Sequence, residues 1–216
     1  MRYFVSLAFA LLLNSSALLA DELNIDLVDK NNKPLANMVV YLQRLDDIVL
    51  PRNNDIVEIG QLNRSFTPYI SVMQLGNEVS FNNQDNITHH IYSPVGKNKF
   101  SFKLRAGKSQ RKKDFQQLGE VAMGCNIHDW MSGYLLIVDT PLFGKTNEKG
   151  FISFNISHAG RYKVIVWHPQ LDADQNRVKQ LINWQKDQQL TIKIENTISA
   201  LSVQENDDEF DFSSDY

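Results

Sequence analysis

Apolar and polar residues alternate in short segments along most of the chain beyond residue 20. Residues 23–29 alternate strictly, and a turn at residues 31–34 separates them from an apolar segment at 38–42. Similar short segments recur at 65–72, 78–81, 87–92, 100–104, 121–125, 134–138, 151–154, 162–167 and 190–194. A period of two is typical of strands with one buried face. The pattern predicts an all-β sandwich that opens with a hairpin over residues 23–42.

Two later segments add detail to this prediction. In residues 121–125 the odd positions share one face of a strand, which predicts that Val121 and Met123 enter the core. Cys125 then lies at the end of the same face. Residues 172–189 stay ambiguous, because their apolar positions suit a short helix as well as a strand.

The first twenty residues have the pattern of a secretory signal peptide. Arg2 precedes an apolar stretch at residues 5–13 that is too short to span a bilayer, and small residues follow it. We expect cleavage before Asp21 and a periplasmic or secreted mature chain with no stable membrane insertion. An uncleaved membrane anchor is the alternative interpretation.

Charge is unevenly distributed along the chain, whose formal net charge is −3. Residues 205–216 hold six acidic side chains and no basic one, whereas residues 97–113 hold eight Lys or Arg and no acidic one. The acidic end is typical of a solvated, disordered tail, which we place at residues 197–216. The basic run indicates either a solvated face or a docking patch for an acidic partner. Export and the net negative charge argue against a nucleic-acid partner.

Cys125 is the one cysteine of the chain, and it lies among other metal-binding side chains in Gly124-Cys125-Asn126-Ile127-His128-Asp129-Trp130-Met131. An exported thiol with no second cysteine has no partner for an internal disulfide. The residues after Cys125 form a short loop before the strand at 134–138, so its thiolate, the His128 imidazole and the Met131 thioether can reach one point. A buried structural cysteine is the alternative.

A second candidate ligand region lies upstream, where His89 and His90 stand at the start of a predicted strand. Either histidine would complete a set of two His and one Cys with a weak Met, which is the ligand set of blue-copper electron-transfer centres. Two His and one Cys can also hold zinc. The other histidines, His158 and His168, are not expected to be ligands.

With both regions in view, the chain resembles the cupredoxin (blue-copper) family, with its amicyanin-like and plastocyanin-like members. It also resembles exported bacterial proteins described as methylamine-utilisation-like. The resemblance rests on Glu78-Val79-Ser80-Phe81-Asn82-Asn83, Asp85-x-x-x-His89, His89-His90-Ile91-Tyr92-Ser93, Cys125-x-x-His128-x-x-Met131, Asp139-Thr140-Pro141 and Trp167-His168-Pro169. It implies a Greek-key β-sandwich that binds one type 1 copper through His89, Cys125, His128 and Met131. His89 rather than His90 occupies the family's ligand position, and strand alternation turns His90 to the other face.

Segments on either side resemble a second β-unit, a carboxypeptidase-regulatory or transthyretin-like sandwich. This resemblance rests on the turns and alternating strands of residues 29–41 and 146–164. We therefore expect a signal peptide at 1–20, a cupredoxin domain at 55–141, a flanking sandwich made of 21–54 and 142–196, and the acidic tail.

The family resemblance implies a periplasmic carrier of single electrons that serves a redox partner protein, such as a cytochrome or a dehydrogenase. Copper storage or delivery is one alternative, and a metal-free or zinc-bound interaction module is another. We expect no enzymatic activity, because the chain has five histidines and no His-x-His pair for further copper centres.

Several neighbours of the ligands are expected to assist them. Asn83 and Asn126 would donate hydrogen bonds around the sulfur and so tune the potential, and His90 is the alternative ligand. Trp130 would cover the metal or form an apolar docking surface. The basic candidates for docking an acidic partner are Lys108, Arg111, Lys112 and Lys113.

Overall fold

The computed structural model describes residues 21–200; the predicted signal peptide and residues 201–216 lie outside this part. The described chain is almost entirely β-strand, with one short 3₁₀ turn at Asp174–Asn176. The strands are β1 (Asp21–Asp29), β2 (Val39–Arg44), β3 (Ile56–Leu62), β4 (Ser65–Thr67), β5 (Ile70–Gln74), β6 (Glu78–Asn83), β7 (His89–Ser93), β8 (Phe100–Leu104), β9 (Ser109–Lys112), β10 (Gly119–Cys125), β11 (Ser132–Val138), β12 (Phe143–Lys145), β13 (Phe151–Ile156), β14 (Gly160–Trp167), β15 (Arg177–Trp184) and β16 (Gln188–Ile194). The predicted all-β class is confirmed. Among these residues no helix is long and apolar enough to cross a membrane.

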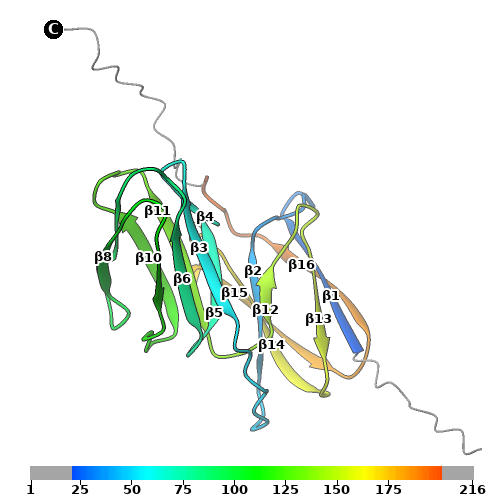
Figure 1. The fold of residues 1–216 in the computed structure, drawn as a ribbon. Helices are drawn as coiled ribbons and strands as arrows, with labels where there is room; N and C mark the ends of the chain where they lie inside the picture. Colours follow the sequence, from blue (N-terminus) through cyan, green and yellow to red (C-terminus); the bar gives the residue numbers. More distant parts are fainter. Residues whose placement is uncertain (1–20, 201–216) are drawn as a thin grey trace, which may run out of the picture.

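The strands form four sheets (Figure 1). Sheet A has the order β13-β1-β16, sheet B β12-β2-β14-β15, sheet C β4-β3-β6-β9 and sheet D β5-β11-β10-β7-β8. Sheets A and B combine the first two strands with the last five, and sheets C and D use all the strands between them. The segment that forms sheets C and D is thus inserted between the two parts of the chain that form sheets A and B.

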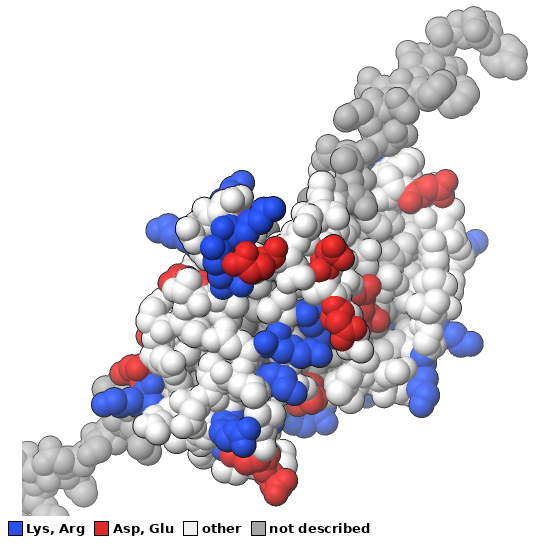
Figure 2. All heavy atoms as spheres, turned by 180° about the vertical axis from the view of Figure 1, so that it is seen from behind, with Lys and Arg blue, Asp and Glu red and all other residues white. Residues whose placement is uncertain are grey.

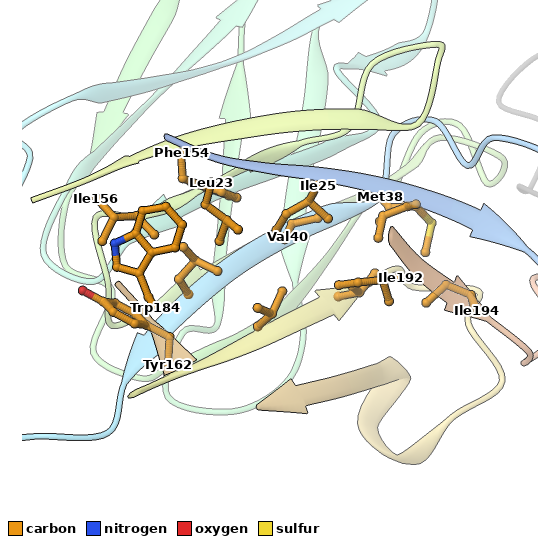
Figure 3. Packing of buried hydrophobic residues seen from close by; sticks show 14 of the residues in the cluster. Leu23, Ile25, Met38, Val40, Phe154, Ile156, Tyr162, Trp184, Ile192 and Ile194 are labelled. Atoms are coloured by element: carbon orange, nitrogen blue, oxygen red, sulfur yellow. The ribbon is translucent and has the colours of Figure 1, made fainter. Parts of the chain in front are cut away.

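Sheets A and B enclose an apolar core, part of which Figure 3 shows from close by. Leu23, Ile25 and Leu27 of β1 are completely buried, and they lie in one cluster with Val40 of β2 and Trp184 of β15. The alternating positions of β1 all face this core, as the period of two predicts. Each such side chain stabilises the fold by about 1.5–3 kcal/mol through its burial.

Sheets C and D enclose the second core, which contains the candidate ligands. Val121, Met123 and Cys125 of β10 are 2%, 4% and 3% exposed, so the predicted shared face of this strand is confirmed. Phe81 of β6 and Ile91 of β7 are fully buried in the same cluster. The site is therefore built at the end of a well-packed core.

Sheets B and D also pack against each other, through a third apolar cluster. Its buried members are Val39, Tyr41, Ile165 and Trp167 from sheet B and Ile70, Leu136 and Val138 from sheet D. Strands β2, β11 and β14 therefore bury side chains on both faces, which explains their nearly continuous apolar sequences. The order of the layers is A, B, D, C, and the two sandwiches share an apolar junction.

The predicted hairpin over residues 23–42 is wrong. Strand β1 pairs with β13 and β16 in sheet A, whereas β2 pairs with β12 and β14 in sheet B. The turn between them does form, because the Asp29 carboxylate accepts hydrogen bonds from the N–H groups of Asn31 and Lys33, both at 2.8 Å. However, the two strands do not hydrogen-bond to each other. Their apolar side chains meet in the core between sheets A and B.

Other differences concern the segments that the alternation described poorly. Residues 65–72 form two strands in different sheets, since Pro68 interrupts them, and the ambiguous residues 172–189 contain the 3₁₀ turn and strand β15. Strands β3, β9 and β12 were not predicted.

Residues 197–200, which we placed in the tail, are held by hydrogen bonds: Asp172 N–H donates to Thr197 O at 2.9 Å, and Ser199 N–H donates to Gln170 O at 3.1 Å.

Candidate metal centre

Four strands bring their ends together at one edge of the C and D sandwich. Strand β6 ends at Asn83, β7 begins at His89, and β10 ends at Cys125, opposite Ile91 in the antiparallel ladder with β7. Strand β3 runs parallel to β6, so the turn between β3 and β4 lies at the same edge. We call this edge the site end.

Three side chains that can bind a metal converge at the site end. The Sγ atom of Cys125 lies 3.7 Å from Nδ1 of His89 and 3.7 Å from Nδ1 of His128. The three donor atoms all lie within 4.8 Å of one another. His89 is 0% exposed, Cys125 3% and His128 8%. Residues far apart in the chain thus form a compact, nearly dry triangle of one sulfur and two nitrogens.

The two sulfur–nitrogen distances fit a bound metal ion. First-row metals such as zinc lie about 2.3 Å from a thiolate sulfur and about 2.0–2.1 Å from an imidazole nitrogen. At angles between tetrahedral and trigonal, such bonds separate sulfur from nitrogen by about 3.6–3.8 Å. Both observed distances fall in this range. The cluster can hold one copper ion, and its soft thiolate suits copper or zinc better than a hard cation.

The hydrogen bond between His89 and Asp85 leaves the other ring nitrogen of His89 for a metal. Its Nε2 lies 2.8 Å from Oδ2 of Asp85, and since a carboxylate only accepts, Nε2 carries the proton. In the neutral imidazole, Nδ1 then directs a lone pair toward the Cys125 sulfur. The Cys125 thiol can donate to this lone pair, and both atoms can bind a metal ion once the thiol has lost its proton.

Backbone hydrogen bonds shape the loop of residues 126–131. Asn126 N–H donates to His90 O at 3.0 Å, Met131 N–H donates to His128 O at 3.0 Å, and Cys125 N–H donates to Met131 O at 3.2 Å. The last bond closes the loop at its base and brings Met131 back beside Cys125. Met131 is 1% exposed and belongs to the same buried cluster as Cys125. Its role as a weak fourth ligand stays a prediction.

His128 lies nearest the surface of the three donors. Its ring centroid is 5.2 Å from that of His89 and 5.4 Å from that of the half-buried Trp130. Burial lowers the pKa of His128, the charges of His89 and Arg64 lower it further, and Asp85 acts in the opposite direction. A neutral imidazole near pH 7 is the form that binds a metal.

The expected neighbours of the ligands lie close to them but act differently from the prediction. The Asn83 side-chain amide donates to Ile87 O at 2.8 Å and to Leu104 O at 2.9 Å, so both of its hydrogens are used away from the sulfur. Asn126 Nδ2 lies 3.3 Å from His90 Nδ1. We therefore correct their proposed role: these amides hold backbone segments and a neighbouring ring, and neither donates to Cys125.

His90 lies outside the donor triangle. Its Nε2 is 2.8 Å from Ser101 Oγ on β8, on the face of β7 opposite to His89. Together with Asn126, it ties the start of the ligand loop to sheet D. Of the two histidines left open by the residue pattern, the structure brings His89 to the cysteine.

The basic residues predicted for docking lie on β9 and directly beside its two ends. Lys108 is exposed near the site end, where its carbonyl oxygen accepts a hydrogen bond from Asn83 N–H at 2.9 Å. Arg111, Lys112 and Lys113 lie progressively farther away, since each strand residue advances the chain by about 3.3 Å.

Two of these side chains also have partners of their own. Arg111 lies 3.8 Å from Glu78, and Lys112 pairs with Asp114 above the rings of Phe100 and Phe115. The face drawn in Figure 2 carries basic and acidic side chains interspersed. Among the predicted basic residues, Lys108 alone is near the ligands.

The sequence interpretation used Asp85 only as part of a spacing and missed its contacts. Its carboxylate accepts the His89 N–H and two backbone N–H groups from the turn between β3 and β4, Asn63 at 2.7 Å and Arg64 at 3.0 Å. Burial alone would raise the pKa of Asp85, but the hydrogen bonds from Arg64, His89 and Asn63 lower it. The alternation gave no signal for these contacts, because strand β3, which leads into the turn, was not predicted.

Comparisons with known proteins give partial structural likenesses. No family model and no curated protein sequence matches the chain. A copper-containing nitrite reductase from Thermus scotoductus SA-01 is 24% identical over 45% of this chain and 26% of its own, with a TM-score of 0.38. A purple cupredoxin from Nitrosopumilus maritimus is 21% identical over 38% of this chain and 99% of its own, with a TM-score of 0.34. An oxidized amicyanin mutant is 10% identical over 45% of this chain and 99% of its own, with a TM-score of 0.36.

These likenesses span less than half of this chain and about a quarter of the nitrite reductase chain. Sheets C and D form the cupredoxin-like β-sandwich that the sequence resemblance implied. In this sandwich the loop with Cys125 and His128 joins the adjacent antiparallel strands β10 and β11, and His89 begins the next strand of the sheet. The assignment of the candidate ligands rests on this geometry.

Proposed function

We propose that this protein is a type 1 copper protein that carries single electrons in the periplasm or another extracytoplasmic compartment. The observation that supports the proposal best is the buried triangle of His89, Cys125 and His128, with both sulfur–nitrogen distances at 3.7 Å. Met131 would be its weak fourth ligand. The unpaired cysteine and the signal-like first twenty residues support the compartment.

The side chains divide the work of such a centre. A bound copper ion would supply reversible one-electron chemistry. Cys125 and His89 lie on strands of the core and hold their donor atoms in fixed positions. His128, on the loop, lies nearest the surface, and the Trp130 ring beside it is partly exposed. We infer that electrons enter and leave at this side, through contact with a redox partner protein.

The burial of the donors favours a carrier over an enzyme. His89, Cys125 and His128 are at most 8% exposed, so a substrate has little room to reach a metal between them. An electron needs only close approach of the partner, not direct contact with the metal. We therefore infer electron exchange without turnover of a substrate at this site.

The test is a titration of the purified, metal-free protein with Cu(II), followed by visible spectroscopy. We expect one equivalent of copper to produce an intense thiolate-to-copper band. Cys125→Ser should abolish the band completely, because the hydroxyl is not a soft thiolate donor. His90→Ala is the matched control, and it should keep the band because His90 lies outside the triangle.

Other outcomes of this titration would contradict the proposal. Colourless binding of Cu(I) without reversible oxidation would indicate storage or delivery of copper. Binding of zinc in preference to copper would indicate a structural site. A band that survives Cys125→Ser would remove the assigned sulfur ligand, and the absence of any metal binding would remove the metal centre.

A further inference from the structure

The turn between β3 and β4 forms a small binding site for a carboxylate beside the candidate metal centre. Leu62 and Ser65 pair across the hairpin, and the two residues between them, Asn63 and Arg64, have φ angles of 54° and 57°. A two-residue turn with both φ angles positive belongs to type I′. Consecutive N–H groups in such conformations form a concave site that favours a negative charge.

Asp85 occupies this site and joins it to His89. Oδ1 of Asp85 accepts from Asn63 N–H at 2.7 Å, while Oδ2 accepts from Arg64 N–H at 3.0 Å and from His89 Nε2–H at 2.8 Å. The loop that carries Asp85 is itself held, since Asp85 N–H donates to Asn83 Oδ1 at 3.0 Å. The His89 ring is 0% exposed, whereas the two hydrogen bonds from the turn to Asp85 lie at the surface.

We propose that Asp85, held by the backbone of the Asn63–Arg64 turn, is a positioning residue that fixes His89 as the permanent imidazole ligand and strengthens its donation to the metal. The proposal rests on the copper site proposed above. Carboxylate partners of metal-binding histidines fix the tautomer and ring orientation and make the imidazole more basic. A more basic imidazole stabilises Cu(II) relative to Cu(I), so Asp85 lowers the midpoint potential.

The turn matters to this proposal through its backbone and not through its side chains. Both donors to Asp85 are main-chain N–H groups, so substitution of the Arg64 side chain leaves them in place. The turn belongs to sheet C, whereas His89 and Cys125 belong to sheet D. Asp85 therefore links the two sheets at the metal centre, so that the position of His89 depends on both.

The decisive experiment compares Asp85→Asn with Asp129→Asn in the full chain. Asp129 is exposed and adjacent to His128, so its substitution removes a negative charge from the same end without touching the His89 contact. We expect Asp85→Asn to weaken Cu(II) binding about 10–100-fold in competition with a chelator, and to raise the midpoint potential. Asp129→Asn should change the affinity less than about threefold. Arg64→Gly, which keeps the N–H and suits a positive φ, should also keep the affinity.

A second measurement needs no variant and no metal. Long-range ¹H–¹⁵N spectra of the metal-free wild-type protein should show a slowly exchanging proton on Nε2 of His89, held by Asp85. A proton on Nδ1, or a ring that exchanges between tautomers, would overturn the proposal even if Asp85→Asn failed to fold. Equal affinities and potentials for Asp85→Asn and Asp129→Asn would also overturn it.

The results separate this inference from the proposed function. If the wild-type protein binds no copper, the proposed function fails while the tautomer of His89 still tests the positioning by Asp85. If the wild-type protein gives the thiolate band and Asp85→Asn keeps the same affinity and potential, the function stands and the positioning role is wrong.

Discussion

The two sandwiches of this chain differ in what their cores contain. The core between sheets A and B consists of apolar side chains such as Leu23, Ile25 and Trp184. The sandwich of sheets C and D buries a similar apolar cluster, but it also buries polar side chains at the site end, among them His89, Asn83 and His128. Buried polar groups cost free energy unless they are paired, so their concentration in one sandwich marks where the chemistry lies.

The comparison indicates that the sandwich of sheets A and B supports the candidate metal site, which lies in the sandwich of sheets C and D. Strands β2 and β14 of sheet B are buried on both faces, between their own core and the junction with sheet D. Strands β5 and β11 of sheet D lie on this junction, and β11 starts immediately after the ligand loop. The flanking sandwich therefore holds the strand that follows Cys125, His128 and Met131 from behind.

A substitution at the junction between sheets B and D should have the largest effect on the free energy of unfolding. Trp167 is fully buried there, and Trp167→Ala should lower the free energy of unfolding by about 3–5 kcal/mol through lost contacts and a cavity. We expect the wild-type protein to unfold in one transition and the variant to unfold in two, because the sandwiches lose their coupling. Urea unfolding followed by fluorescence and by the copper band checks this.

Trp167→Phe is the matched control for the junction. It keeps an aromatic ring, and the Trp167 Nε1 has no hydrogen-bond partner among residues 21–200, so no bond is lost. Its effect should be well below that of Trp167→Ala. A single unchanged transition in Trp167→Ala would show that the two sandwiches are not energetically coupled.

His168 is a buried histidine outside the candidate metal cluster, and it can be compared with the histidines at the site end. His168 follows β14, and its Nδ1 accepts a hydrogen bond from Gln170 N–H at 3.3 Å. Burial lowers the pKa of His168 to about 4, from 6.5 for an exposed imidazole. Between these values the unfolded chain binds a proton that the folded chain does not, so stability should fall by about 3 kcal/mol as the pH falls from 6.5 to about 4. Above pH 6.5 this contribution is fully present.

The variant His168→Asn isolates this contribution. Its amide oxygen can replace Nδ1 as the acceptor, and it does not titrate. The difference in unfolding free energy between wild type and His168→Asn should depend on pH between 6.5 and 4 and be constant above. A constant difference over the whole range would assign the acid sensitivity to other groups.

The smallest expected effect comes from a matched pair of isoleucines. Ile25 and Ile91 are both 0% exposed, one in each core, and Ile91 lies opposite Cys125 in the sheet. Ile25→Val and Ile91→Val should each cost about 0.5–1.5 kcal/mol. Only Ile91→Val should shift the thiolate-to-copper band, because the packing around the sulfur tunes the metal. A shift caused by Ile25→Val would contradict the division of roles.

Much of the candidate site could be predicted because its chemistry is local in the chain. The spacing of Cys125, His128 and Met131 placed three donors on one short loop, and strand alternation separated His89 from His90. Asp85 could not be assigned a role in this way, since its partners Asn63 and Arg64 lie more than twenty residues upstream. Their approach depends on the parallel pairing of β3 with β6, and the alternation did not predict β3.

The sequence by itself determined the β-class, the buried face of residues 121–125 and the loop of candidate donors, because period-two alternation and short spacings depend on neighbouring residues alone. Only the tertiary structure decided which strands pair, how sheets B and D join the sandwiches and what holds His89. Strands 23–29 and 39–44 show the reason. Each has the pattern of a strand, but whether two such strands pair or face each other across a core depends on the rest of the chain competing for their edges.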